Sequence, residues 1–250
     1  MLVLLSALPA RAAAPPDSAR TAAAPASSGG GFLFGAPHGF LALRVGASFP
    51  RAASDVFDHS RQYLTLERGD FAGVTFGGDV GVRLLSRLDG VLSLGVSHAS
   101  HPSEDQNFVE DNNLPIRQQT SFTQVPITAG LRLSLLPEGR AVGSLAWIPS
   151  RVVPFVGAGG GLTYYRFVQS GDFVDYTDQT IFTDELRSSG WGPTAHVFGG
   201  FDISLSPRFA LTAQARYTWA SAGMDQTTFD GFNDIDLSGL QTTVGLNVRF

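Results

Sequence analysis

One stretch decides the fold: Leu240-Gln-Thr-Thr-Val-Gly-Leu-Asn-Val-Arg-Phe250, the last eleven residues of the sequence. Apolar and polar residues alternate along it, with Val244, Leu246 and Val248 on the apolar face. A period of two predicts a β-strand with one apolar and one polar face. The stretch is long enough to cross a membrane as a tilted strand, which takes about 9–11 residues. Such a strand needs partners, and the rest of the chain is expected to supply them.

The composition excludes a membrane protein built of helices. No stretch approaches 18 consecutive apolar residues, glycine is frequent (29 residues) and only 16% of the residues are charged. These features remain compatible with a β-barrel. The chain has no cysteine, and all 17 of its basic residues are arginine. Its net charge of −5 and its lack of a basic run exclude nucleic acid as a partner.

The first 37 residues predict export. Residues 1–14 contain a short apolar core and then Ala10-Arg-Ala12, which fits the A-x-A cleavage site of a signal peptide. No positive segment precedes this core, so a disordered Ala-rich tail is the alternative. Residues 15–37, rich in Ala, Pro, Ser and Gly, predict a flexible leader. This division leaves residues 38–250 as the folded domain.

Seven further segments also alternate. With the C-terminal stretch, the predicted strands are residues 41–49, 74–84, 92–97, 124–135, 152–167, 195–205, 211–219 and 240–250. Long polar connections (50–70, 101–120, 168–190 and 221–236) alternate with shorter ones (86–90, 137–151 and 206–208). The pattern predicts an all-β fold: an eight-stranded antiparallel up-and-down transmembrane β-barrel with four long outer loops and short periplasmic turns. Glycine blurs the alternation in residues 152–167, which leaves the facing of that strand open. Trp147, in the connection before it, is expected at a membrane interface.

The polar face of the strands carries small residues and a few isolated charges. Surfaces that face water usually carry many long charged side chains, whereas small residues with a few opposite charges suit a crowded lumen. A soluble barrel with the Leu/Val face inside is the alternative. The expected lumen charge network consists of Arg44, Asp79, Arg83, Arg132, Asp202, Arg216 and Arg249. It either plugs the barrel or lines a narrow conduit for small solutes; eight strands favour a plug.

Four motifs occur in a fixed order: Gln124-Val-Pro-Ile-Thr-Ala-Gly-Leu-Arg132, Val153-Pro-Phe-Val-Gly-Ala-Gly-Gly-Gly161, Ala215-Arg-Tyr-Thr-Trp219 and the ending at Phe250. With them, residues 38–250 resemble the small bacterial outer-membrane β-barrel superfamily, which includes the OmpA transmembrane domain, OmpX, OmpW and the opacity proteins. The resemblance implies location in the bacterial outer membrane and contact with its lipids and lipopolysaccharide. It also implies an assembly signal, here Val248 and Phe250, that the barrel-assembly machinery recognises. The superfamily is functionally mixed, so the expected function is a non-enzymatic structural or surface-interaction role without a cofactor.

His98-Ala-Ser100 provides the alternative from another class, an enzyme. Small outer-membrane lipid deacylases use a His-x-Ser pair in which histidine is the base and serine the nucleophile, oriented by an acid. The asparagine that commonly follows the family's serine is replaced here by His101. His98 is in phase with the apolar face of its strand, a position that also suits a histidine at the membrane interface.

The long connections hold 17 of the 22 acidic residues, which predicts an acidic outer rim. Two groups of carboxylates offer oxygen ligands for Ca²⁺: Asp225, Asp230, Asp234 and Asp236, and Asp172, Asp175 and Asp178. Their spacing lacks the EF-hand pattern, so solvated acids are expected and no metal is predicted. Aromatic residues in the same connections either form a surface that binds an extracellular ligand or pack on one another. They are Phe57, Tyr63, Phe108, Phe173, Tyr176, Phe182, Phe229 and Phe232.

Overall fold

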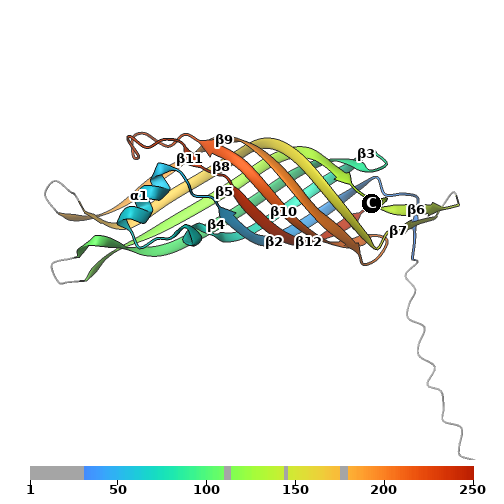
Figure 1. Ribbon diagram of the computed structural model, residues 1–250, viewed down its shortest axis with the longest axis horizontal. Coiled ribbons are helices and arrows are strands. Elements are labelled where there is room, and N and C mark those ends of the chain that lie inside the picture. The colour runs from blue at the N-terminus through green and yellow to red at the C-terminus, as the bar shows by residue number, and fades with distance from the viewer. Residues whose placement is uncertain (1–30, 110–113, 144–145, 175–179) are drawn as a thin grey trace, which may run out of the picture. The chain divides into compact units, whose positions relative to one another are not determined.

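Eight antiparallel strands close into a barrel in the computed structural model, which describes residues 31–109, 114–143, 146–174 and 180–250 (Figure 1). The strands are β2 (Gly39–Pro50), β3 (Gly73–Leu85), β4 (Leu88–Val109), β5 (Pro115–Ser134), β8 (Val152–Val174), β9 (Ile181–Ser204), β10 (Phe209–Ala222) and β12 (Gly239–Arg249). Each pairs with the next along the chain, and β12 pairs with β2 to close the ring. The predicted eight-stranded antiparallel barrel is confirmed. The predicted signal peptide and the leader as far as residue 30 lie outside the described residues.

The C-terminal strand joins the two ends of the sheet. Leu246 of β12 lies opposite Leu43 of β2 on one side and opposite Leu211 of β10 on the other. Beyond the strand, the amide of Phe250 donates a hydrogen bond to the carbonyl oxygen of Gly39 at 3.0 Å. The carbonyl oxygen of Phe250 accepts hydrogen bonds from the amides of His38 and Gly39 at 2.7 and 3.0 Å. These bonds fasten the last residue of the sequence to the start of β2.

Side chains alternate between the inside and the outside of the barrel. Leu43 is 67% exposed on the outer face, whereas its neighbour Arg44 is 7% exposed inside. Outward positions along β12 are uncharged: Leu240, Thr242, Val244, Leu246 and Val248. The Leu/Val face therefore points outwards and the polar face inwards. In β8, whose facing was left open by the sequence, Val153 and Phe155 are buried inside and Val152 and Val156 lie outside.

Two of the predicted loops are wrong. Residues 101–120 and 168–190 consist largely of strand. In the first, β4 continues to Val109 and β5 begins at Pro115; in the second, β8 continues to Val174 and β9 begins at Ile181. The two hairpins pair with each other as far as Gln118 opposite Gly171. Their outer parts carry apolar residues such as Ile116, Phe173 and Phe182 at irregular positions, so no regular apolar alternation marked them as strand. They extend beyond the barrel at what we call the α1 end, on the left of Figure 1.

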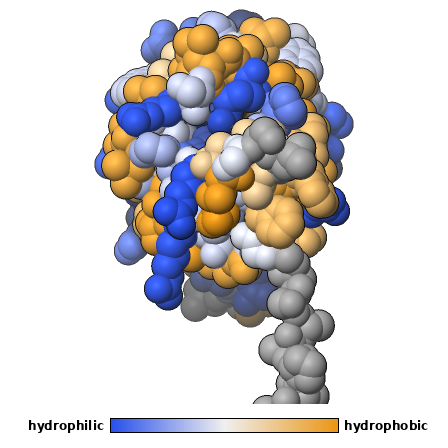
Figure 2. Space-filling view, turned by 90° about the vertical axis from the view of Figure 1, so that its right-hand side faces the viewer, coloured by the Kyte–Doolittle hydropathy of each residue, from blue (hydrophilic) through white to orange (hydrophobic). Residues whose placement is uncertain are grey.

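The opposite end, called the C-terminal end, carries the shorter connections. The turn predicted at residues 86–90 is tighter, since β4 already begins at Leu88. Residues 137–151 are not a simple turn. They contain β6 (Gly139–Val142) and β7 (Ala146–Pro149), which form a three-stranded sheet with β1 (Leu33–Phe34). Figure 2 looks onto this end and shows hydrophobic residues around much of its perimeter with hydrophilic ones between them.

The α1 end is closed by an apolar cap. The connection after β2 forms α1 (Asp55–Tyr63) and the 3-10 helix η1 (Arg68–Phe71), and β11 (Ile235–Asp236) precedes β12. Val56 and Phe57 are buried on one face of α1. Phe57 makes edge-to-face contacts with three rings, at centroid distances of 4.8 Å to Phe71, 5.4 Å to Phe122 and 5.8 Å to Phe167. The cap consists of Ala52, Val56, Phe57, Leu64, Leu66, Phe71, Phe122, Tyr165, Phe167, Ala220, Ala222, Met224, Phe229, Ile235 and Leu237. No helix in the described part of the chain is long and apolar enough to span a membrane.

Candidate functional site

The middle of the barrel holds a cluster of Arg44, Asp79, Ser93 and Arg216. Nη2 of Arg44 donates to Oδ1 of Asp79 at 2.7 Å, and Nε of Arg44 lies 2.7 Å from Oδ2. Ser93 Oγ donates to the same carboxylate at 2.5 Å, and Nη2 of Arg216 donates to Ser93 Oγ at 3.3 Å. One carboxylate thus faces two guanidinium groups, with Arg216 3.9 Å from it. A charge-assisted hydrogen bond of this kind fixes orientation as well as charge.

A second cluster lies nearer the C-terminal end. Arg132 donates to Asp202, whose other oxygen accepts a hydrogen bond from Thr212 Oγ1 at 2.7 Å. The guanidinium carbon of Arg132 lies 3.8 Å from the ring centroid of Phe155 and 4.9 Å from that of Phe40. Cation–π contact and an ion pair together hold this arginine inside the barrel. The inward Phe155 is therefore a packing partner for a charged side chain.

A third cluster lies at the rim of the C-terminal end. Arg83 donates to Asp89 at 2.5 Å and to Glu138, which also accepts a hydrogen bond from Ser134 Oγ at 2.7 Å. Asp89 and Glu138 are absent from the network predicted from the sequence, as is His196, whose buried ring stacks on Phe198 at a centroid distance of 5.7 Å. Asp89 and Glu138 lie beside connections and gave no periodic signal. His196 lies on the polar face of its predicted strand, a signal that could have found it.

Trp147 is a correction to the sequence prediction. It is only 5% exposed and lies over the interior, not at a membrane interface. The guanidinium carbon of Arg249 lies 5.9 Å from the centroid of the Trp147 ring, and Arg249 Nη1 donates to Ser204 Oγ at 2.9 Å. A Cβ atom added to Gly139 would come within 2.4 Å of Trp147, so β6 accepts only glycine there without a shift. The sheet of β6 and β7 thus brings the indole across the C-terminal end.

Side chains leave little space around the second and third clusters. Just above the C-terminal end, the cavity bounded by Arg83, Asp89, Arg132, Asp202 and Arg249 has a volume of only about 10 Å³. This is at most one water-sized space. All seven residues of the predicted lumen network lie on the inner side of the wall. Six of them fall into the three clusters, and Arg249 contacts Ser204 and Trp147 instead. Eight strands leave an interior just wide enough for such side chains.

The structure does not connect His98 with Ser100. Both are exposed on the outer face of β4. His98 Nδ1 lies 2.9 Å from Thr123 Oγ1, and Ser100 Oγ lies 2.8 Å from Ser121 Oγ. Ser100 Oγ also accepts a hydrogen bond from Gln119 Nε2 at 2.7 Å. No carboxylate contacts His98 among the described residues, so the base and the orienting acid of a hydrolase are not assembled.

The acidic loops do not gather into a metal site. Within the described residues, no group of three or more Asp, Glu or His side chains is close enough to hold a metal ion. Asp225 accepts a hydrogen bond from the amide of Thr227 at 3.0 Å, which stabilises a local turn. Of the second predicted group, Asp172 accepts from Thr183 Oγ1 at 2.5 Å, whereas Asp175 and Asp178 lie outside the described residues.

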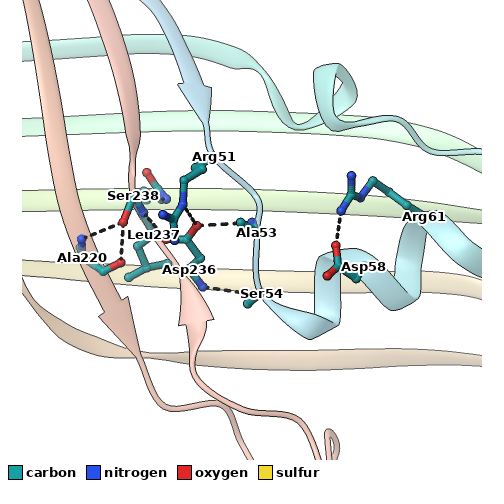
Figure 3. A network of polar contacts seen from close by, with 10 residues as sticks. Arg51, Ala53, Ser54, Asp58, Arg61, Ala220, Asp236, Leu237 and Ser238 are labelled. Carbon is teal, nitrogen blue, oxygen red and sulfur yellow. Dashed lines mark hydrogen bonds and ion pairs between the residues drawn. The ribbon is translucent and has the colours of Figure 1, made fainter.

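Asp236 has a structural role instead (Figure 3). Its carboxylate accepts hydrogen bonds from Arg51 Nε at 2.9 Å and from the amide of Ser238 at 3.0 Å. Its own amide donates to Ser54 Oγ at 3.1 Å, just before α1. Burial alone would raise the pKa of Asp236, but the hydrogen bonds from Arg51 and Ser238 outweigh it and hold that pKa below its ordinary value. The carboxylate thus ties the two chain segments of the cap together.

The loop aromatics have two fates. Phe57 packs in the cap, as one of the two sequence alternatives expected. Tyr63, Phe173 and Phe232 border a cavity beside α1, and Phe229 belongs to the cap and also borders this cavity. Phe173 also stacks on Phe182 at a centroid distance of 5.9 Å. Tyr176 lies outside the described residues.

No family model and no curated protein matches the sequence. Several solved structures are similar to it. The outer membrane protein OprG from Pseudomonas aeruginosa shares 16% identity over 87% of this chain and 99% of its own, with a TM-score of 0.46. Neisserial surface protein A shares 15% identity over 88% of this chain and 98% of its own, with a TM-score of 0.43. Ail, the attachment invasion locus protein of Yersinia pestis, shares 13% identity over 85% of this chain and 99% of its own, with a TM-score of 0.43. The chain has the fold of the small outer-membrane barrels that its sequence resembles, an assignment that rests on its own strand pairing.

Proposed function

We propose that this chain is a non-enzymatic β-barrel protein of the bacterial outer membrane, with a closed lumen and a structural or surface-interaction role. The outer face of the strands supports the location, since exposed Leu, Val and Phe side chains cover it. Contiguous apolar surface of this kind is a liability in water. In a bilayer it is the expected exterior of a barrel, where long charged side chains are costly.

Aromatic side chains on the outer face support the same location. Towards the α1 end, Trp191 and Trp219 are about half exposed, and each contacts a tyrosine: Tyr164 at 5.4 Å and Tyr217 at 4.8 Å between centroids. Phe250 is 63% exposed at the C-terminal end. Membrane barrels carry such aromatic residues at both interfaces, where one side of the ring meets lipid and the other meets polar groups.

The closure of the barrel is the observation that carries the proposed function. Three charged clusters occupy the interior, Trp147 covers Arg249 at one end, and Phe57 anchors the cap at the other. Each guanidinium group has a carboxylate, hydroxyl or ring partner, as buried charges require. A plug of this kind would leave no continuous path for water. It favours a structural or surface role over that of a small-solute porin.

The proposed partners follow from the location. Outer-membrane lipids and lipopolysaccharide would contact the apolar belt and its aromatic rims. Val248 and Phe250 lie at the barrel seam, in the position of the assembly signal that the superfamily presents to the barrel-assembly machinery. Surface interaction would use the α1 end, where two hairpins extend from the barrel and carry much of the acidic charge.

Electrical recording tests the closed lumen. The purified protein is first shown to be folded by a band that shifts on boiling, and it is then inserted into planar bilayers. We expect no single-channel steps. A variant in which Arg44, Arg132 and Arg216 are alanine empties part of the lumen and serves as the positive control, provided that its band still shifts on boiling. Stepwise conductance of the unaltered protein would contradict the proposal and favour the conduit alternative.

A further inference from the structure

A cavity of about 150 Å³ lies at the α1 end, bordered by the cap residues Val56, Leu64 and Phe229 and apart from the charged clusters of the lumen. Side chains of α1 form one wall, with His59, Ser60 and Tyr63. The hairpins β4–β5 and β8–β9 form the opposite wall, and the segment around Phe232 closes a third side. A cavity of this volume accepts a molecule of one aromatic ring, about the size of benzene.

Three of its walls are aromatic. The ring of His59 lies 4.4 Å from that of Tyr63 and 5.4 Å from that of Phe232. Phe232 in turn lies 6.1 Å from Phe229. Burial lowers the pKa of His59, so its ring is neutral near neutral pH. Neutral rings around a small space offer faces and edges against which another aromatic ring can pack.

Two glutamines of the cavity use their amide nitrogens as donors within the protein. Gln169 Nε2 donates to Ser60 Oγ at 3.0 Å, and Gln118 Nε2 donates to the carbonyl oxygen of Asp172 at 2.9 Å. The side-chain carbonyl oxygens of both glutamines accept no hydrogen bond from the described residues. Asp105 adds a carboxylate, and neither arginine nor lysine lines the cavity. A donor with positive charge therefore matches this site, whereas an anion would meet the carboxylate of Asp105 and no cationic side chain.

We propose that this cavity binds a small protonated aromatic amine. The ring would lie against Tyr63 and Phe232, and the ammonium group would donate to the carbonyl oxygens of Gln118 and Gln169 near Asp105. The cavity gives the α1 end a ligand of defined chemistry, and so deepens the proposed surface role on which it rests.

Three probes of equal size test the charge preference: benzylamine, benzyl alcohol and benzoate. Binding to the folded protein in a nonionic detergent is measured by saturation-transfer NMR. We expect saturable binding of benzylamine, weaker binding of benzyl alcohol and none of benzoate. Equal signals for all three probes would indicate partition into the micelle and overturn the proposal.

Two variants place the ligand in the cavity. F232A removes a ring against which the aryl group of the ligand packs, and it is expected to weaken benzylamine binding about fivefold, as the loss of one aromatic contact implies. D105N keeps the hydrogen bonds that Asp105 Oδ1 accepts from the amides of Asn107 and Phe108. It is expected to weaken benzylamine binding about twofold to fivefold, within the range for a screened ion pair, and to leave benzyl alcohol unchanged.

Phe34 supplies the matched control. It is 84% exposed and lies at the C-terminal end, so F34A should change none of the three affinities. Unchanged benzylamine binding in both F232A and D105N, each with a normal shift on boiling, would place the ligand elsewhere and refute the proposal. The bilayer recording gives a separate answer. Conductance with intact benzylamine binding would refute only the closed lumen, and silent bilayers without binding would refute only the cavity.

Discussion

Arg51 and Asp236 are 185 positions apart in the sequence, yet Arg51 Nε donates a hydrogen bond to Asp236 Oδ2 at 2.9 Å. The pair joins the end of β2 to the strand β11. Three further donors converge on this junction: the amide of Ala53 reaches Asp236 Oδ2 at 3.3 Å, that of Ser238 reaches Oδ1 at 3.0 Å, and the hydroxyl of Ser238 reaches the carbonyl oxygen of Ala220 at 3.2 Å (Figure 3). One carboxylate thus links the connection that forms α1 to the connection that precedes β12.

The pKa of Asp236 should depend on Arg51. In the folded protein it is expected below about 3.9, the usual value for aspartate. A lowered folded pKa means that the carboxylate stabilises the cap above the unfolded pKa, and that this contribution is lost as the pH falls through the folded pKa. R51A should raise the pKa, because burial then acts with less opposition. The ¹³C shift of the Asp236 carboxyl carbon against pH measures it; R61A, whose partner is Asp58, should have no effect.

Asp79 is expected to stabilise the folded barrel. D79A would leave Arg44 and Arg216 without their carboxylate in a buried space, which costs about 3–5 kcal/mol. We expect a lower urea midpoint for the loss of the band that shifts on boiling. V80A, at the neighbouring lipid-facing position, removes two methyl groups from an exposed side chain and should move the midpoint much less. Equal midpoints for D79A and the unaltered protein would mean that the ion pair contributes no stability.

Phe57 should stabilise the packing of the cap but not the closed barrel itself. Its ring is fully buried among Phe71, Phe122 and Phe167, and replacing a buried Phe by Ala costs about 3–5 kcal/mol. In F57A we expect faster trypsin cleavage after Arg61 or Arg68, with the boiling shift retained. R61A would remove one of the sites and reveal which bond is cut. Loss of the boiling shift in F57A would show that the cap and the barrel unfold together.

Ser100 should be dispensable. Its hydroxyl contacts Ser121 and Gln119, and His98 is bonded to Thr123. S100A is therefore expected to leave the acylation of lipid A unchanged in cells that express the protein. Mass spectra of lipid A check this, with cells that lack the protein as the reference. A change that the protein causes and that S100A abolishes would establish the deacylase alternative.

The wall of the barrel could be predicted because the bilayer or the lumen constrains every second residue there. Leu43 and Arg44 illustrate the alternation on which that prediction depended. The hairpin ends gave no such signal, since polar residues such as Gln118 and Gln119 follow one another there and no apolar face repeats. Backbone hydrogen bonds hold these ends in strand, and such bonds leave no pattern in the sequence.

The site was predictable to a similar extent. Arg132 and Asp202 were expected inside because each interrupts a polar face of small residues. Glu138 was not expected, since it lies in a connection and reaches Arg83 only once the chain has folded around the rim. The cavity beside α1 was beyond prediction for the same reason, because it is formed by segments far apart in the sequence whose aromatic residues follow no period.

The charged interior of the barrel and the apolar cap at its α1 end are stabilised by different forces, so a change of solvent should affect one more than the other. Salt screens charges over about 8–10 Å of water, but the pairs of Arg44 and Arg132 are buried beyond its reach, and the interior should respond little to ionic strength. The apolar cap around Phe57 should tighten in sulfate and loosen on cooling, as hydrophobic contacts do. In the cold, the outer surface would open first, over an interior that stays locked.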